Sequence, residues 1–168
     1  MIFLTVGTQF PFERLVKSVD LAVNQNGFGE QIFAQIGQCS YQPQSFKSVV
    51  SLEKQQFDKY MREASCVISH AGMGTISMAL DYNKPMLVMP RLKRYGEVVN
   101  DHQMAIARRF EELGIILVAY ETGELPQKLK QLMSFTPRRR DAEPQKVAER
   151  IAQFLMQTSV SKKGAEVK

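Results

Sequence analysis

The stretch SHAGMGT, residues Ser69–Thr75, joins two apolar runs through a segment with two glycines, a histidine and two hydroxyl side chains. Closely spaced glycines let a backbone curve around a ligand, and the start of a helix offers free N–H groups that favour negative charge. A nucleotide diphosphate or the edge of a sugar would satisfy those groups. His70 either bonds the ligand or satisfies a carbonyl of the turn. The candidate ligand-binding residues here are Ser69, His70, Ala71, Gly72, Met73, Gly74 and Thr75, with Thr75 expected to start the helix.

A second glycine loop follows the apolar N-terminal run. Gly7 and Thr8 come directly after residues 1–6 and before a segment with helical spacing. The loop is either a phosphate site or an ordinary strand-to-helix turn capped by Thr8. It matches neither G-x-G-x-x-G nor a P-loop.

A third polar segment, PRLKRYGEVVNDHQ at 90–103, is long for a connection between a strand and a helix, and long loops in compact domains are usually functional. Asn100 or Asp101 is a plausible N-cap. His102 and Gln103 carry donors and acceptors that suit sugar hydroxyls. The basic residues Arg91, Lys93 and Arg94 either form a solvated loop or meet phosphate.

Other chemistries find less support in the sequence. His70, His102 and Asp101 lack the spacing of a metal-ligand set, and neither a Ser-His-Asp triad nor a catalytic carboxylate pair can be picked out. Cys39 and Cys66 indicate neither a disulfide framework nor a metal site. The net charge is +5, but the positive residues are not interleaved with aromatic ones, so we expect no nucleic-acid partner. Phosphates or an anionic membrane suit this charge better.

These loops need elements that bring them together. Of the 168 residues, 44% are hydrophobic, enough for one packed domain. Apolar runs predict strands at 1–6, 31–36, 49–52, 66–69, 86–89 and 115–119. Helical spacing predicts helices at 12–26, 53–63, 75–82, 100–113, 125–133 and 144–157. Alternating strands and helices favour a Rossmann-like three-layer α/β/α fold with a mainly parallel sheet, which binds ligands at the carboxyl ends of its strands.

The domain is expected to span residues 1–157, with a disordered polar tail at 158–168. The N-terminus lacks the basic region of a signal peptide, and no window approaches the ~20 apolar residues of a spanning helix. We therefore expect a cytoplasmic protein.

At these motifs the sequence resembles a known family. VISHAGMGTISMALDYNKPMLVMPRL and NDHQMAIA are similar to the C-terminal half of family 28 glycosyltransferases, over most of residues 1–155. The likeness extends to the single-domain, donor-binding subunits of split enzymes. These include the eukaryotic transferase that adds the second N-acetylglucosamine to dolichol-diphosphate and bacterial exopolysaccharide subunits of the PssE type.

The resemblance implies one half of a GT-B enzyme: an inverting hexosyltransferase subunit that binds a UDP-sugar and needs no metal or other cofactor. A separate membrane-associated subunit would bind a lipid-linked acceptor for surface polysaccharide, supply the base and recruit this chain to the inner face of the membrane. Gly7 and Thr8 would handle the diphosphate, 69–75 the phosphate and sugar, and His102 and Gln103 the sugar hydroxyls. The remaining donor-binding candidates in the third loop are Arg91, Glu97 and Asp101.

One position departs from the family. A relative that forms lipid II has an acidic residue that holds the ribose where this chain has Met78. Glu97 or another group substitutes, or the backbone alone holds the ribose. Two other functions remain open: a non-catalytic nucleotide-binding regulatory subunit of the same fold, and a self-sufficient nucleotide-sugar epimerase or hydrolase.

Overall fold

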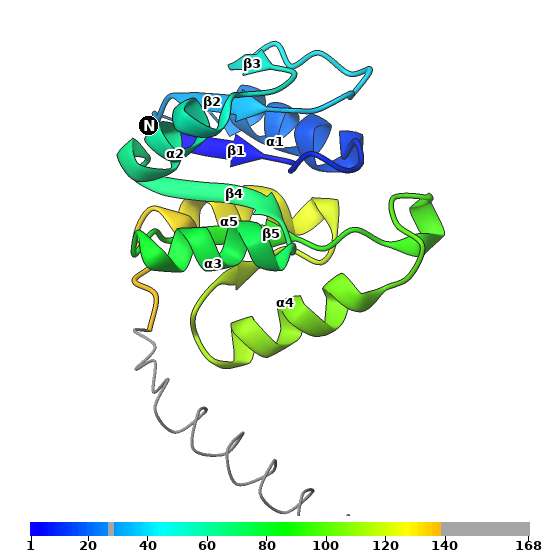
Figure 1. Cartoon of the computed structure of the whole chain (residues 1–168), viewed down its shortest axis with the longest axis vertical. Coiled ribbons are helices and arrows are strands. Elements are labelled where there is room, and N and C mark those ends of the chain that lie inside the picture. Colours follow the sequence, from blue (N-terminus) through cyan, green and yellow to red (C-terminus); the bar gives the residue numbers. More distant parts are fainter. Residues whose placement is uncertain (27–28, 139–168) are drawn as a thin grey trace, which may run out of the picture. The chain divides into compact units, whose positions relative to one another are not determined.

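The computed structural model describes residues 1–26 and 29–138 (Figure 1). Its centre is a six-stranded sheet in the order β3-β2-β1-β4-β5-β6, in which every neighbouring pair is parallel. The strands are β1 Ile2–Thr5, β2 Ile32–Gln35, β3 Lys47–Val49, β4 Cys66–His70, β5 Met86–Met89 and β6 Leu117–Val118. The expected parallel sheet is confirmed.

Helices cover both faces of this sheet. The α-helices are α1 Glu13–Asn26, α2 Lys54–Glu63, α3 Met73–Asp81, α4 His102–Glu112 and α5 Leu125–Leu132, and two short 3₁₀ helices are η1 Lys93–Tyr95 and η2 Thr122–Glu124. Leu15 of α1 and Leu129 of α5 belong to one buried apolar cluster. Met61 of α2, Ile76 of α3 and Ala107 of α4 belong to a second cluster. These two clusters make the three layers that the sequence predicts.

The apolar runs of the strands explain why both faces are covered. Successive side chains of a strand point to opposite faces, so a strand without polar residues needs a core on each side. Ile2 and Leu4 of β1 pack into the first cluster, and Phe3 between them packs into the second. In β5, Leu87 belongs to the first cluster and Val88 to the second.

Several boundaries differ from those predicted. The helix after the glycine-containing stretch at 69–75 begins at Met73 rather than Thr75, because Gly72 is the N-cap and its carbonyl already accepts the N–H of Ile76 at 3.1 Å. Gly74 therefore lies in the first turn of α3. The third strand lies at 47–49 rather than 49–52, α4 begins at 102 rather than 100, and β6 has two residues.

An aspartate fastens the connection between β2 and β3. Asp20 of α1 is buried, and its carboxylate accepts hydrogen bonds from the Tyr41 hydroxyl at 2.6 Å, the Ser45 N–H at 2.7 Å and the Gln44 N–H at 3.1 Å. Backbone N–H groups that no strand partner reaches are thereby satisfied.

The predicted helix at 144–157, the domain boundary at 157 and the tail at 158–168 lie outside the described residues. Within residues 1–26 and 29–138, none of the helices combines the length and the apolar character needed to span a bilayer.

Candidate active site at the carboxyl edge of the sheet

The three loops that the sequence singles out meet around one cavity. Its volume is about 470 Å³, and it opens where β1, β4 and β5 end. The lining residues are Gly7, Thr8, Gln9, Phe10, His70, Gly72, Met73, Gly74, Thr75, Arg91, Val98, Val99, His102 and Gln103. Four of the candidates, Ser69, Ala71, Glu97 and Asp101, are not among them.

The imidazole of His70 lies between two glycines. Gly7 has a φ of +75°, and a Cβ added to it would lie 2.8 Å from Cε1 of His70. A Cβ on Gly72 would overlap the same ring. Gly7 and Gly72 therefore make room for the protein's own histidine. Gly74 differs, because a Cβ at that position meets nothing within 4 Å beyond its chain neighbours and its own helix, and Gly74 lines the cavity.

Hydrogen bonds fix the proton of this imidazole. The Ser69 hydroxyl donates to the Thr5 carbonyl at 2.5 Å and lies 3.1 Å from Nδ1 of His70. Because the single hydroxyl proton is already donated, Ser69 accepts the proton of Nδ1. Burial, and then repulsion from Arg91, lowers the pKa of His70 from its usual 6.5 to about 4. The ring is neutral near pH 7, and its Nε2 carries a lone pair beside Gly72.

Arg91 supplies a buried positive charge at the cavity wall. The residue is 2% exposed, and its Nη2 donates to the carbonyls of Val6 at 2.7 Å and Phe10 at 2.5 Å. Its Nε is buried without a hydrogen-bond partner, and within the described chain no carboxylate forms an ion pair with it. Glu97 attracts Arg91 electrostatically but is itself paired with Arg14, so an anionic ligand beside the buried guanidinium would be favourable. Arg91 is thus not part of a solvated basic loop.

The start of α3 adds to this positive potential. Gly72 provides no side-chain cap, and Met73, Gly74 and Thr75, which carry the first N–H groups of the nine-residue helix, line the cavity. Among the lining residues, all of them described, there is no aspartate or glutamate. A helix start and a buried arginine together favour an anion such as a phosphate.

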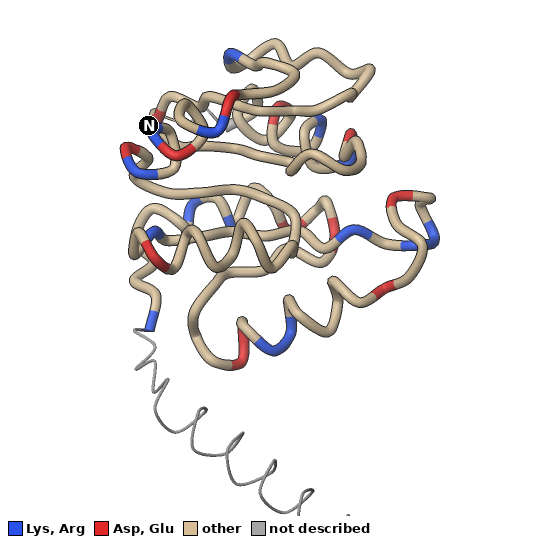
Figure 2. The backbone as a smooth tube through the Cα atoms, viewed as in Figure 1, with Lys and Arg blue, Asp and Glu red and all other residues tan. Residues whose placement is uncertain are grey.

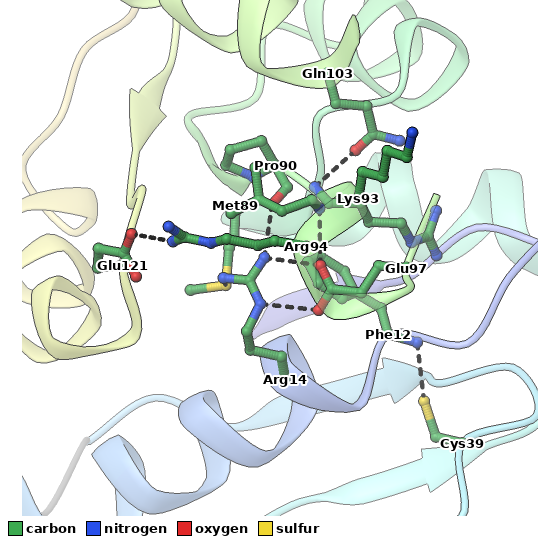
Figure 3. A network of polar contacts seen from close by, with 12 residues as sticks. Phe12, Arg14, Cys39, Met89, Pro90, Lys93, Arg94, Glu97, Gln103 and Glu121 are labelled. Carbon is green, nitrogen blue, oxygen red and sulfur yellow. Dashed lines mark hydrogen bonds and ion pairs between the residues drawn. The ribbon is translucent and has the colours of Figure 1, made fainter. Parts of the chain in front are cut away.

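Gln103 faces the cavity from the first turn of α4. It is 5% exposed, and its Oε1 accepts the Arg91 backbone N–H at 3.1 Å (Figure 3). This bond orients the side-chain amide so that its NH₂ group points away from Arg91 N. His102 is exposed and lies 2.5 Å, through Nδ1, from Oδ1 of Asn100.

Glu97 and Asp101 serve the loop itself. The Glu97 carboxylate accepts from Arg14 Nε at 2.8 Å, Arg14 Nη2 at 2.9 Å and the Leu92 N–H at 2.9 Å (Figure 3). Asp101 accepts the Lys93 N–H at 2.7 Å. The pairing of Glu97 lends no support to a ribose contact by this residue, and Met78 packs against the second apolar cluster.

Sequence reasoning missed Arg14, which fastens the connection between β5 and α4. Besides Glu97, Arg14 bonds the Pro90 carbonyl at 2.8 Å and stacks over Tyr95, with its Cζ 4.7 Å from the ring centroid. Charged residues of both signs lie along this connection (Figure 2). Nothing in the sequence distinguishes Arg14 from other basic residues of the first helix. Val98 and Val99 were also missed, although an apolar pair in a polar loop is a usable signal.

Two smaller cavities adjoin the same loops. One of about 150 Å³ continues past Gly7 toward Gly37 and Val50 at the ends of β2 and β3. The other, of about 340 Å³, lies beside Arg14 and Tyr95. Among the described residues, no cluster of three or more His, Cys, Asp or Glu side chains is arranged to hold a metal ion.

Comparison with known proteins agrees with this geometry. The glycosyltransferase family 28 C-terminal domain matches residues 1–158. The chain belongs to this family. The UDP-N-acetylglucosamine transferase subunit ALG13 of Candida albicans is 36% identical over 70 residues, which are 42% of this chain and 22% of that protein. The match therefore spans less than a quarter of that relative.

Solved structures share the fold. An NMR solution structure of ALG13 gives a TM-score of 0.59 at 21% identity and covers 86% of this chain and 91% of that chain. MurG of Acinetobacter baumannii gives 0.59 at 22% identity and covers 78% of this chain and 40% of that one. The fold is that of the C-terminal domain of a GT-B glycosyltransferase.

Proposed function

We propose that this chain is the UDP-sugar-binding subunit of a two-component inverting hexosyltransferase. The observation that carries this proposal is the positive cavity formed by the start of α3 and the buried, unpaired Arg91. A diphosphate seated there would receive N–H groups of the helix and the charge of the guanidinium. Since these groups are fixed before the ligand arrives, they would also stabilise the charge that develops on a leaving diphosphate.

The sugar would extend from the diphosphate toward α4. Gln103 and His102 line this side of the cavity, and the Gln103 amide is already oriented by Arg91. Amide and imidazole groups suit sugar hydroxyls because they both donate and accept. Nucleotide-sugar specificity is thus proposed to arise at the first turn of α4.

The base that activates the acceptor hydroxyl is proposed to come from a second protein. Of the described residues lining the cavity, His70 is a weak base with a pKa of about 4, Arg91 cannot accept a proton at neutral pH, and His102 is already proposed to contact the sugar hydroxyls. In MurG and in the kitacinnamycin glycotransferase, the shared fold accounts for 40% and 34% of the chain. By analogy, the missing half is a membrane-associated subunit that binds a lipid-linked acceptor and brings this chain to the membrane surface.

A PssE-like role in surface polysaccharide synthesis is the biological setting that we infer from the sequence resemblance. The proposed transfer reaction requires no metal ion, since Arg91 and the start of α3 provide the positive charge that a metal ion would otherwise supply.

Gly74 gives the most direct test of the donor site. In Gly74→Val, the first side-chain carbon meets nothing beyond its chain neighbours and its own helix, so the change adds bulk at a residue that lines the cavity. We expect the Kd of UDP-N-acetylglucosamine, measured by calorimetry, to rise at least tenfold, about 1.4 kcal/mol. Gly123→Val is the matched control, because Gly123 also has open space and lies outside the cavity. Equal affinities of the two folded variants would contradict the proposal.

A further inference from the structure

His70 is the titratable group of the cavity whose chemistry the proposed function leaves unused. Its Nδ1 proton is held by Ser69, because the Ser69 hydroxyl donates to Thr5. The proton-free Nε2 lies next to Gly72, at the start of α3. A nitrogen lone pair repels phosphate oxygens, whereas an imidazolium N–H donates a charge-assisted hydrogen bond to them.

We propose that His70 takes up a proton at Nε2 when a nucleoside diphosphate ligand binds, and holds the diphosphate as an imidazolium. The inference rests on the proposed function, because it places the diphosphate at the start of α3. The proton comes from solvent, adds to the Nε2 lone pair and leaves the Nδ1–H bond to Ser69 intact. When the ligand leaves, the proton returns to solvent.

The surroundings of His70 make this uptake depend on the ligand. From the connection after β5, Arg91 repels an imidazolium, and the positive end of α3 does the same. From β1, the Thr5 carbonyl favours the protonated ring, and from β5 the residue in register is the apolar Met89. No carboxylate lines the cavity within the described chain. The negative charge that would reverse this balance has to come with the ligand.

Because ligand binding and protonation of His70 are coupled, the affinity for the ligand should change with pH in a defined direction. The pKa of free His70 is about 4, and the ligand raises it, so the bound state holds more protons. Affinity is therefore greatest at low pH and falls about tenfold per pH unit until the pKa of the bound state is passed. Above that pKa, the affinity no longer changes with pH.

Calorimetry counts the protons directly. UDP-N-acetylglucosamine is the probe, because its diphosphate is esterified at both ends and keeps a constant charge near neutral pH. The titration is run at about pH 6.5 in MES and in imidazole, whose ionisation enthalpies differ, so that the difference in heat gives the protons taken up. We expect an uptake of about one proton with the wild-type chain and none with His70→Gln, whose amide N–H replaces Nε2–H but does not titrate.

A second measurement does not depend on the fold of a variant. The chain has two histidines, so its proton NMR spectrum has two imidazole Cε1–H signals, which His102→Gln assigns. On addition of the probe, the His70 signal of the wild-type chain should move to the imidazolium position. Binding without proton uptake, or with an unmoved signal, would overturn this inference and leave the proposed function standing. Failure of the wild-type chain to bind UDP-N-acetylglucosamine or UDP would overturn both.

Discussion

Among single residues, Arg91 contributes most directly to the proposed chemistry, since its charge is buried and its Nε has no hydrogen-bond partner. Arg91→Met should weaken UDP-N-acetylglucosamine binding by about 2 kcal/mol, roughly 30-fold, the magnitude of a lost hydrogen bond to a charged group. Arg91→Lys keeps the charge but replaces the planar guanidinium by a single ammonium group. Its affinity for UDP-N-acetylglucosamine should therefore lie between those of the wild-type chain and Arg91→Met. Calorimetry measures all three chains.

The control for this series is Arg108→Met. Arg108 is exposed on α4 and does not line the cavity, so its loss removes one positive charge without touching the site. If Arg108→Met weakened donor binding as much as Arg91→Met, the arginine effect would come from overall charge and not from the buried guanidinium.

Asp20 stabilises the fold, and its contribution to the free energy of unfolding depends on pH. Burial raises its pKa, but the hydrogen bonds from Tyr41, Gln44 and Ser45 outweigh burial and hold the pKa below its usual value. This stabilisation is present above the unfolded pKa and is lost as pH falls through the folded one. Asp20→Asn should lower the unfolding free energy by about 1–3 kcal/mol near neutral pH, and by less at about pH 3. Urea denaturation at both pH values, with exposed Asp81→Asn as control, measures the difference.

Residue types predicted which loops border the cavity, but not the contacts that each residue makes. Spacing predicted that the loops at Gly7, Gly72 and Gln103 would meet, because the strands before them are apolar and parallel. Which member of the basic run at 91–94 turns inward depends on the carbonyls of Val6 and Phe10, more than eighty residues away in sequence. No local pattern reveals contacts of that range.

Between elements, the Arg14–Glu97 pair ties α1 to the connection between β5 and α4. The side chains are 13% and 10% exposed, so removing one partner leaves the other charge largely desolvated. We expect Arg14→Met and Glu97→Gln each to destabilise the fold, and the double variant to lose less than the sum of the two by about 1–3 kcal/mol. Chemical denaturation of the four chains measures this coupling. Additive losses would show that the pair contributes little beyond its separate packing.

The sequence predicted which segments form helices and which form strands, but it did not predict the residues at which these elements begin and end. The apolar strands needed a core on both faces, which decided the layers. The start of α3 at Met73 instead reflects the extended backbone of Gly72, whose φ and ψ are −89° and 130°. This geometry also leaves space for His70, a tertiary requirement that helix propensity does not encode.

For the molecule as a whole, the proposed division of labour predicts that the purified chain binds its donor and transfers no sugar. Transfer of radiolabelled sugar to membrane lipid should begin when the acceptor-binding subunit is added, because that subunit is proposed to bring the base. Robust transfer by the isolated chain would place the base among its own residues. Donor binding without transfer, even with that subunit and the lipid acceptor present, would instead support a regulatory subunit.

The bonds from Arg91 to Val6 and Phe10 join residues 85 and 81 positions apart, and the bond from Ser69 to Thr5, between β4 and β1, joins residues 64 positions apart. A ribosome synthesises the loop at Gly7 long before it has made Arg91, which holds that loop. Until then, the apolar strand Ile2–Thr5 emerges without its inner neighbour, and such unpaired strands aggregate readily. We therefore expect the N-terminal segment of the nascent chain to need protection by chaperones, and the proposed donor site to form only after synthesis has passed residue 91.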